Sequence, residues 1–335
     1  MDLNISFIIP VFNRPQEIEE LLDSFIGLNY NGTYEIVIIE DGSSISSKPI
    51  VDAFSDRLNI SYYFKENSGP GDSRNFGMSK GKGNYFIILD SDCILQPEYL
   101  NNILDALNKD FTDCFGGPDA AHPSFSNLQK AINFSMTSFI TTGGIRGNKK
   151  SINTFEPRSF NMGISEEAFL RSGGFGNIHP GEDPDLSIRL NKLGFKTKLI
   201  SNAFVYHKRR ISWAKFFKQV YKFGLARPIL NKWHPDTRRF TYWLPTLFGL
   251  GLLLSVILLF FGYASFLLVY VIYFILVFVV SLIKNKNLLV SIMSVFATLI
   301  QFLGYGFGFI LSTVKISIFN KKPDQVFPFL FFKTK

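Results

Sequence analysis

The first hundred residues alternate short apolar runs with longer stretches of helical character. One of these stretches begins with Pro15, a residue common in the first turn of a helix. Regular alternation of strands and helices is typical of an α/β fold with a doubly wound parallel sheet. The expected strands are 5–11, 34–39, 60–64 and 85–89, and the expected helices are 15–26, 71–79 and about 97–107.

The pattern changes after residue 239. No Asp, Glu, Lys or Arg occurs from Phe240 to Ile283, and the stretch from Leu288 to Val314 is also free of charge. A helix needs about 20 apolar residues to cross a bilayer, so we expect a transmembrane region over 240–318. The expected transmembrane helices are about 243–261, 266–283 and 288–314.

The net charge of +8 is concentrated beside these apolar stretches. Basic residues crowd an amphipathic juxtamembrane segment, 211–239, and recur at Lys284, at Lys286 and in the tail 319–335. Cations favour the cytoplasmic side of a membrane, so both ends of a two-helix hairpin fit the cytoplasm. The basic tail fits that side too, which three crossings would forbid. Two interpretations stay open: three crossings, or two crossings and a re-entrant third stretch, which contains Gly304, Gly306 and Gly308.

Several absences narrow the class of protein. The N-terminus lacks the basic segment of a signal peptide, so we expect the polar domain 1–210 in the cytoplasm, held on the inner membrane by the multi-pass region. The cations beside the apolar stretches indicate membrane lipids as partners rather than nucleic acid. Cys93 and Cys114 fit neither a metal-ligand spacing nor a disulfide framework. Neither a dinucleotide fingerprint nor a phosphate-binding loop occurs, so a nucleotide must be bound in another way.

Polar residues follow three of the four expected strands. Asn13 and Arg14 follow the first, Glu40 and Asp41 the second, and Asp90, Ser91 and Asp92 the fourth. In open α/β sheets ligands bind outside the carboxyl ends of the strands. Asp90 and Asp92 directly follow the apolar run 85–89, and we expect the chain to turn at Asp90–Asp92. The pair predicts a site for Mg²⁺ or Mn²⁺ that also carries a diphosphate.

Seven short motifs occur in order along the chain. They are Ile8–Arg14, Glu40–Ser44, Asn67–Asn75, Leu89–Asp92, Gly173–Phe175, Glu182–Asp183 and His207. In this order they resemble the family-2 glycosyltransferases over about residues 5–227, and an ordered set is far more specific than one D-x-D pair. The resemblance implies the GT-A fold, a Rossmann-like α/β domain of nucleotide-diphospho-sugar transferases, followed here by C-terminal transmembrane helices.

The resemblance implies roles for residues on the donor side. It places Pro10, Asn13, Arg14 and Ser91 at a nucleotide sugar, a UDP- or GDP-sugar, with Asp41 on the base. Gly71 and Arg74 let backbone and a cation approach the diphosphate, with a structural ion pair as the alternative for Arg74. Asp90 meets the ribose or the metal, and Asp92 binds the metal.

It also implies the chemistry of the acceptor side. Family members invert the anomeric centre in one displacement, which needs a general base on the acceptor hydroxyl. The matching motif makes Asp183 that base, with a pKa raised by partial desolvation, while Glu182 orients the acceptor or supports the loop. Asp185 is expected to cap the helix that it opens. His207 is either the third metal ligand or a structural residue.

Gln219 and Arg227 lie in a segment that resembles the membrane-proximal part of anchored members, where they would reach the diphosphate. Processive synthases of the family have Q-x-x-R-W here, and this chain has Gln219-Val-Tyr-Lys-Phe223. We therefore expect an inverting, hexosyltransferase-type enzyme that moves a sugar to a membrane-proximal, lipid-linked or glycan acceptor in cell-surface polysaccharide biosynthesis. One alternative is a non-catalytic nucleotide-binding membrane protein. The other is a polyprenyl-phosphate sugar transferase, with cations from Lys208, Arg209 and Arg210.

Overall fold

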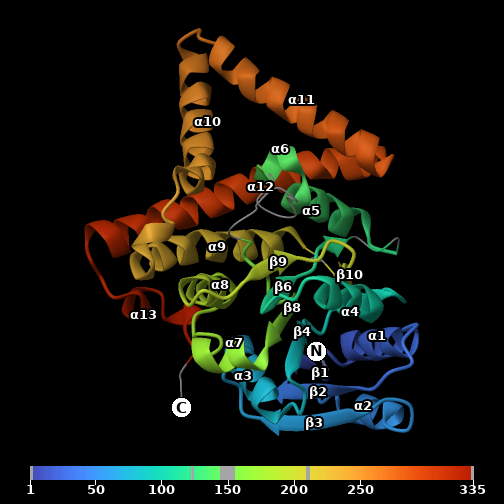
Figure 1. Ribbon diagram of the computed structural model, residues 1–335. Helices are drawn as coiled ribbons and strands as arrows, with labels where there is room; N and C mark the ends of the chain where they lie inside the picture. Colours follow the sequence, from blue (N-terminus) through green and yellow to red (C-terminus); the bar gives the residue numbers. More distant parts are fainter. Residues whose placement is uncertain (1–2, 121, 123, 144–154, 209–211, 333–335) are drawn as a thin grey trace. The chain divides into compact units, whose positions relative to one another are not determined.

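The structure is a computed structural model that describes residues 3–120, 122, 124–143, 155–208 and 212–332. It forms two compact units (Figure 1). The first unit comprises Met1–His122, Gly147–His207 and Phe331–Lys335, and the second comprises Pro123–Arg146 and Lys208–Leu330. The sequence predicted a catalytic domain at 1–210, a juxtamembrane segment at 211–239, a transmembrane region at 240–318 and a tail at 319–335. In the structure, the segment after His122 groups with the apolar helices, and the last residues group with the N-terminal unit.

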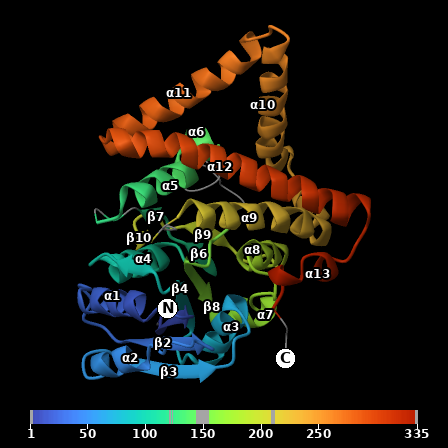
Figure 2. The same cartoon turned by 180° about the vertical axis from the view of Figure 1, so that it is seen from behind.

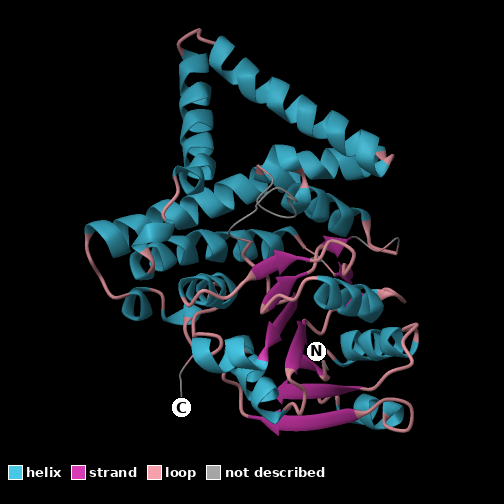
Figure 3. Ribbon diagram, in the orientation of Figure 1, coloured by secondary structure: helices cyan, strands magenta, loops and turns pink. Residues whose placement is uncertain are grey.

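Within the described residues, a seven-stranded sheet forms the centre of the first unit (Figure 3). Its order is β3-β2-β1-β4-β8-β6-β9, and a second sheet has the order β5-β10-β7. The first four strands are parallel as predicted, whereas β8 runs antiparallel to β4 and β6. The strands are β1 Ile5–Val11, β2 Tyr34–Asp41, β3 Ile60–Lys65, β4 Tyr85–Leu89, β5 Cys93–Leu95, β6 Cys114–Gly116, β7 Asp119–Ala120, β8 Asn161–Ser165, β9 Thr197–Leu199 and β10 Val205–His207.

Helices cover both faces of the large sheet because its strands point apolar side chains to both sides. In β1, Phe7 and Ile9 face one apolar core with Leu22, whereas Ile8 faces a second core with Met78. Fully burying one such side chain contributes roughly 1.5–3 kcal/mol. One face carries α1 Pro15–Ile26, α2 Lys48–Phe54 and α4 Tyr99–Lys109, and the other carries α3 Pro70–Lys80, α7 Glu166–Ser172 and α8 Glu182–Lys192.

The expected elements of this unit are confirmed with small shifts at their ends. The predicted strands 5–11 and 85–89 and the predicted helix 15–26 have the bounds that the structure shows. Strand β2 runs two residues further than predicted, so Asp41 lies inside it. Helix α2 was not predicted, because seven residues are too few to show a helical period.

Within the described residues, the second unit has three helices long and apolar enough to cross a membrane: Phe240–Phe260, Ser265–Asn285 and Leu288–Ile318. The third runs uninterrupted past its glycines, so it does not fold back as a re-entrant segment would. The α-helices of the unit are α5 Asn127–Thr137, α6 Phe139–Thr142, α9 Trp213–Trp233, α10 Leu244–Phe260, α11 Ser265–Asn285, α12 Leu288–Ser312 and α13 Pro323–Val326. Shorter turns are η1 Pro235–Thr237, η2 Phe240–Trp243, η3 Thr313–Ile318 and η4 Pro328–Leu330.

Glycines on facing surfaces let α9 and α12 pack closely, and the two helices lie side by side in both views (Figures 1 and 2). A Cβ on Gly224 would overlap the carbonyl oxygen of Tyr305, and a Cβ on Gly308 would overlap that of Tyr221. Small residues allow this approach of two helix backbones, as in membrane helix pairs. The glycines of the third apolar stretch therefore serve packing.

We expect Gly224→Ala to destabilise the second unit by about 1–3 kcal/mol, because the atom that the new methyl group meets is backbone and cannot rotate away. Thermal unfolding of the detergent-solubilised protein measures this. Gly249→Ala is the control, since its Cβ would meet only the flexible end of Leu303, at 3.2 Å. Equal shifts of the melting temperature in both variants would show that the close approach of α9 and α12 contributes nothing.

Candidate functional site

The carboxyl ends of parallel strands bring the predicted site residues to one edge of the sheet. β1 and β4 are parallel neighbours. The loop after β1 carries Arg14, and the turn after β4 carries Asp90 and Asp92. Arg14 Nη1 donates a hydrogen bond to Asp92 Oδ2, and the Arg14 side chain is 34% exposed. A charged group that is bound here and still open to solvent can meet a ligand.

The chain turns after β4, as predicted. The N–H of Cys93 donates to the carbonyl oxygen of Asp90 at 3.1 Å, which closes the turn. β5 then runs antiparallel to β10, in a register that pairs Cys93 with His207. This register places the imidazole of His207 next to the turn, although the two segments are far apart in the sequence.

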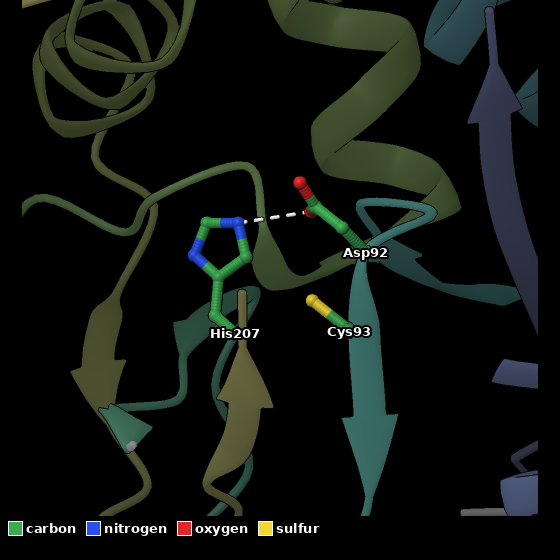
Figure 4. Close-up of side chains that lie close together, drawn as sticks. All are labelled: Asp92, Cys93 and His207. Carbon is green, nitrogen blue, oxygen red and sulfur yellow. Dashed lines mark ion pairs between the residues drawn. The ribbon is translucent and has the colours of Figure 1, made fainter. Parts of the chain in front are cut away.

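Asp92, Cys93 and His207 lie close together (Figure 4). His207 Nε2 is 3.0 Å from Asp92 Oδ1 and 3.9 Å from Asp90 Oδ2, and its ring stacks on Phe160. Burial raises the pKa of the Cys93 thiol well above its ordinary value, and the two nearby carboxylates raise it further. Oxygen donors suit Mg²⁺ and Mn²⁺ better than a thiol does. The carboxylates and the imidazole are therefore the candidate donors, and the Cys93 thiol lies beside them.

This donor set fits a divalent cation. Two ligands in adjacent octahedral positions, each about 2.1 Å from an ion, are about 3.0 Å apart. Asp92 Oδ1 and His207 Nε2 have that separation. Carboxylates suit Mg²⁺ and Mn²⁺, and imidazole is a ligand of transition metals. The same contact is an ion pair whenever the imidazole is protonated, so both interpretations of His207 have a physical basis.

Arg74 is buried and bridges two carboxylates. Its Nη2 donates to Asp90 Oδ1 at 2.8 Å, and its Nη1 donates to Glu182 Oε1 at 2.9 Å. The side chain is only 3% exposed. The guanidinium is thus held in the structural ion pair that was the alternative interpretation of Arg74, and its contact with a diphosphate stays a prediction. Through it the turn after β4 is tied to the start of α8.

Glu182 and Asp183 begin α8 in different surroundings. Glu182 is buried, and it accepts hydrogen bonds from Arg74 and from the N–H of Gly181 and lies 3.0 Å from His179 Nδ1. Burial works against its ionisation, but His179 and Arg74 outweigh burial and hold the pKa of Glu182 below its usual range. Glu182 therefore supports the loop, which is one of the two roles expected for it.

For Asp183, burial outweighs the nearby positive charge, so its pKa shifts in the opposite direction. Its side chain is 17% exposed, and its Oδ2 lies 3.7 Å from Arg158 Nη1. Burial raises the pKa of Asp183, and Glu182 adds to this rise although Arg158 opposes it. A carboxylate that is partly open to solvent and has a raised pKa is suited to accept a proton.

The structure contradicts the expected role of Asp185. Gly181 is the N-cap of α8, and Asp185 lies inside the helix. Asp185 Oδ2 instead accepts hydrogen bonds from Arg189 Nε at 3.0 Å and Nη2 at 2.8 Å. The expectation failed because the helix begins at Glu182, before the position where the sequence pattern placed its start.

Two residues of the site were missed in the sequence. Arg158 contacts Asp183, and His179 contacts Glu182. Arg158 lies in a segment without helical or strand periodicity, so nothing in the pattern marked it. His179 stands in the same segment as Glu182 and Asp183, and that proximity was the available signal.

Asp41 forms hydrogen bonds with the segment that follows β3. Its carboxylate accepts hydrogen bonds from the N–H groups of Ser68 and Gly69, both at 3.0 Å, and pairs with Lys65 Nζ at 2.7 Å. Asp41 is 4% exposed. In this structure it orders the loop before α3, and the contact with a nucleotide base that the resemblance implied stays a prediction.

The other donor-side residues have local structural roles. The Asn13 side-chain oxygen accepts from the Ser44 N–H at 2.8 Å, which links the loops after β1 and β2. Pro10 is partly buried in β1, and Ser91 is buried in the turn. A Cβ on Gly71 would lie 2.7 Å from the carbonyl oxygen of Gly176, so close packing requires this glycine.

Gln219 and Arg227 lie in α9, in the second unit. The Arg227 guanidinium lies over the ring of Tyr242, 4.4 Å from its centroid. The predicted contacts of Gln219 and Arg227 with a diphosphate stay predictions. In the Lys208–Arg210 cluster, Arg209 and Arg210 lie outside the described residues, so the polyprenyl-phosphate alternative stays a prediction as well.

Comparison with known proteins places the N-terminal part of the chain in a family context. Residues 6–171 match the sequence profile described as Glycosyl transferase family 2. An uncharacterized glycosyltransferase of Rickettsia typhi is 34% identical over 105 residues, which are 31% of this chain and 32% of that protein. The poly(ribitol-phosphate) beta-N-acetylglucosaminyltransferase TarS of Staphylococcus aureus is 27% identical over 114 residues, 33% of this chain and 20% of TarS. The chain thus spans about a third or less of the length of these relatives.

A solved structure has a similar fold. The mannosyltransferase PcManGT of Pyrobaculum calidifontis, in complex with GDP-Man and Mn²⁺, superposes with a TM-score of 0.57 at 14% identity. The match covers 96% of this chain and 89% of that chain. At this identity the similarity concerns the fold, and it confirms the expected GT-A architecture of a mixed α/β sheet with C-terminal helices.

Proposed function

Because this chain belongs to the family-2 glycosyltransferases through its domain at residues 6–171, we propose that it transfers a sugar, with inversion, from a nucleotide-diphosphate sugar to a hydroxyl group of a membrane-proximal acceptor. One observation carries the proposal. A donor set for a divalent cation, at Asp92 and His207, is joined through Asp90, Arg74 and Glu182 to a neighbouring carboxylate with a raised pKa, Asp183. A transferase of this class needs both parts.

On the donor side, Asp92, Asp90 and His207 would hold Mn²⁺ or Mg²⁺ with the diphosphate of a UDP- or GDP-sugar. The ion, when bound, offsets the negative charge that develops on the leaving diphosphate. Arg14 adds a permanent positive charge at the open rim of this cluster. The complex of PcManGT with GDP-Man and Mn²⁺ supports this donor class.

On the acceptor side, Asp183 takes the proton of the acceptor hydroxyl. The acceptor oxygen forms a bond to the anomeric carbon while the bond from that carbon to the diphosphate oxygen breaks, so the nucleoside diphosphate leaves and the configuration inverts. Arg158, 3.7 Å away, holds the carboxylate in place, and the Arg74–Glu182 pair fixes the start of α8. No covalent intermediate is needed.

The three long apolar helices support an acceptor at the membrane. The basic residues beside them favour the cytoplasmic side of the inner membrane for the catalytic domain. TarS, by its name, acts on poly(ribitol-phosphate), a polymer. We therefore favour a lipid-linked or glycan acceptor of cell-surface polysaccharide biosynthesis.

The metal site gives a direct test. Purified protein with Mn²⁺ is expected to release nucleoside diphosphate from a UDP- or GDP-sugar, and Asp92→Asn is expected to raise the Mn²⁺ concentration for half-maximal rate by at least about tenfold. Asp110→Asn is the control, because Asp110 is an exposed carboxylate paired with Lys198. An unchanged Mn²⁺ dependence in Asp92→Asn would remove the proposed metal site.

The same assay separates the alternatives. A nucleotide-binding protein without catalysis would show thermal stabilisation by a sugar nucleotide and no release of nucleoside diphosphate. A polyprenyl-phosphate sugar transferase would release nucleoside diphosphate only when a polyprenyl phosphate is supplied, and a hydroxyl acceptor would not replace it. Transfer to a glycan hydroxyl supports the proposal made here.

A further inference from the structure

We propose that this chain crosses the membrane an even number of times, and that α12 lies along the membrane surface, with one apolar face in the lipid, instead of spanning the bilayer. The partner of this face is the headgroup region of a phospholipid leaflet. The proposal concerns the second unit and the path of the chain, and it does not depend on the transferase chemistry.

The segment Lys208–Leu330 of the second unit is connected at both of its ends to the first unit. At one end, β10 finishes at His207. At the other end, Phe331 forms an antiparallel bridge with Ile178, and the N–H of Phe332 donates to the carbonyl oxygen of Asn177 at 3.0 Å. A folded polar domain occupies one side of a membrane. The residues between these two points must therefore cross an even number of times.

Close packing on charged helices distinguishes α12 from the other two apolar helices. Gly304 and Gly308 bring α12 against α9, which carries Lys215, Lys218 and Lys222. If α12 spanned the bilayer, α9 would lie at the same depth with these lysines, and ammonium groups in the bilayer core are strongly unfavourable. In the most apolar part of Leu288–Ile318, 33% of the residues are buried. The corresponding share is 11% in Phe240–Phe260 and 11% in Ser265–Asn285.

Helix α12 also makes polar contacts with α5. Ser135 Oγ donates to Gln301 Oε1 at 2.8 Å, and Gln301 Nε2 donates to the carbonyl oxygen of Thr141, in α6, at 3.4 Å. Helix α5 packs against this side of α12 through Ile132 and Met136, and it also carries the polar residues Gln129 and Lys130. Such neighbours fit the boundary of a membrane and not its interior.

The opposite face of α12 is apolar and exposed. Its exposed residues recur at helical spacing and form a narrow stripe: Leu289, Ile292, Phe296, Leu303 and Phe307. Helix α12 itself carries no charge between Leu288 and Ser312, and the charged groups beside it belong to α9. With α9 on one side and the stripe in lipid, α12 would lie in the plane of the interface, where the stripe enters the boundary between headgroups and acyl chains.

The cations at both ends of α12 agree with this placement. Lys284 and Lys286 precede the helix, and Lys315, Lys321 and Lys322 follow it. Cations prefer the cytoplasmic side. Only an even number of crossings lets both groups lie there. The basic tail, which conflicted with three crossings in the sequence, is consistent with a spanning hairpin of α10 and α11 followed by a surface helix.

Cysteine labelling with a membrane-impermeant maleimide tests the number of crossings. Cys93 and Cys114 are buried and give the wild-type background. We expect Asp56→Cys, Lys286→Cys and Lys321→Cys to react in inside-out vesicles, and Tyr263→Cys, in the turn between α10 and α11, to react only in right-side-out vesicles. All four positions are exposed, so folding should be preserved. Labelling of Lys286→Cys and Lys321→Cys from opposite sides would overturn the proposal.

Depth measurement then tests the position of α12 itself. A nitroxide is attached in turn to Leu289→Cys, Phe296→Cys, Phe307→Cys and, in α11 as a spanning control, Phe266→Cys, Ile272→Cys and Ile283→Cys. We expect a shallow and uniform depth along α12, and a maximum at the middle position of α11. A maximum at Phe296→Cys like that of the control helix would show that α12 spans the bilayer.

Discussion

Replacing Asp183 by Asn is expected to lower kcat for sugar transfer by about 10²- to 10⁴-fold, the usual contribution of a general base. The KM for the nucleotide sugar should change little, because Asp183 is assigned to the acceptor hydroxyl, whereas Asp92 and His207 are assigned to the cation that carries the donor. An amide has nearly the shape of a carboxylate but cannot take up a proton from the acceptor hydroxyl. Steady-state kinetics with a membrane acceptor measure the change.

The pH dependence should follow from the raised pKa of Asp183. Transfer needs the ionised carboxylate, so the rate falls as the pH falls through that raised pKa, which lies above the ordinary 3.8 of an aspartic acid. The sign for stability is the opposite. Above pH 3.8 the unfolded chain ionises this group more readily than the folded protein does, so Asp183 lowers the stability of the fold. This destabilisation disappears as the pH falls below 3.8.

Asp183→Asn should therefore keep or raise the melting temperature at neutral pH while activity is lost. Glu182→Gln provides the contrast. The pKa of Glu182 is lowered in the folded protein, so its ionised form contributes stability above about pH 4.5, and this is lost as the pH falls through the lowered pKa. Glu182→Gln should lower the melting temperature. Wild-type kcat in Asp183→Asn would show that another group is the base.

Replacing Arg74 by Met is expected to destabilise the protein by about 3–5 kcal/mol, the usual loss when one partner of a buried ion pair is removed. Glu182 is 3% exposed and would keep its charge beside an apolar side chain. Asp90 would lose the same partner. Denaturant unfolding, followed by circular dichroism, measures the change in the free energy of unfolding.

A second variant identifies the cause. Adding Glu182→Gln to Arg74→Met removes the uncompensated charge, so the double variant should lose less stability than the two single changes added together. Arg57→Met is the control, because Arg57 lies on the surface over Phe54 and should change stability by about 0.5 kcal/mol or less. Normal stability of Arg74→Met with a raised KM for the nucleotide sugar would instead support a direct contact of Arg74 with the diphosphate.

The sequence by itself determined the elements and the class of the protein. Strand 85–89 and its following Asp90–Asp92 turn could be predicted, because a buried strand is a continuous apolar run and two carboxylates, one residue apart, follow it. The three apolar helices could also be predicted, because each is a continuous apolar run long enough to cross a bilayer core. The order of the motifs indicated the family.

Only the tertiary structure decided which charged groups meet. Arg74 pairs with Glu182 across 108 positions, and Arg14 pairs with Asp92 across 78. The register of β5 with β10 placed His207 beside Asp92. Phe331 returned the end of the chain to the first unit and thereby limited the path through the membrane. Local periodicity records whether a residue is buried in its own helix or strand. It holds no information on the partner across a fold, because that partner is fixed by packing between elements that are distant in sequence.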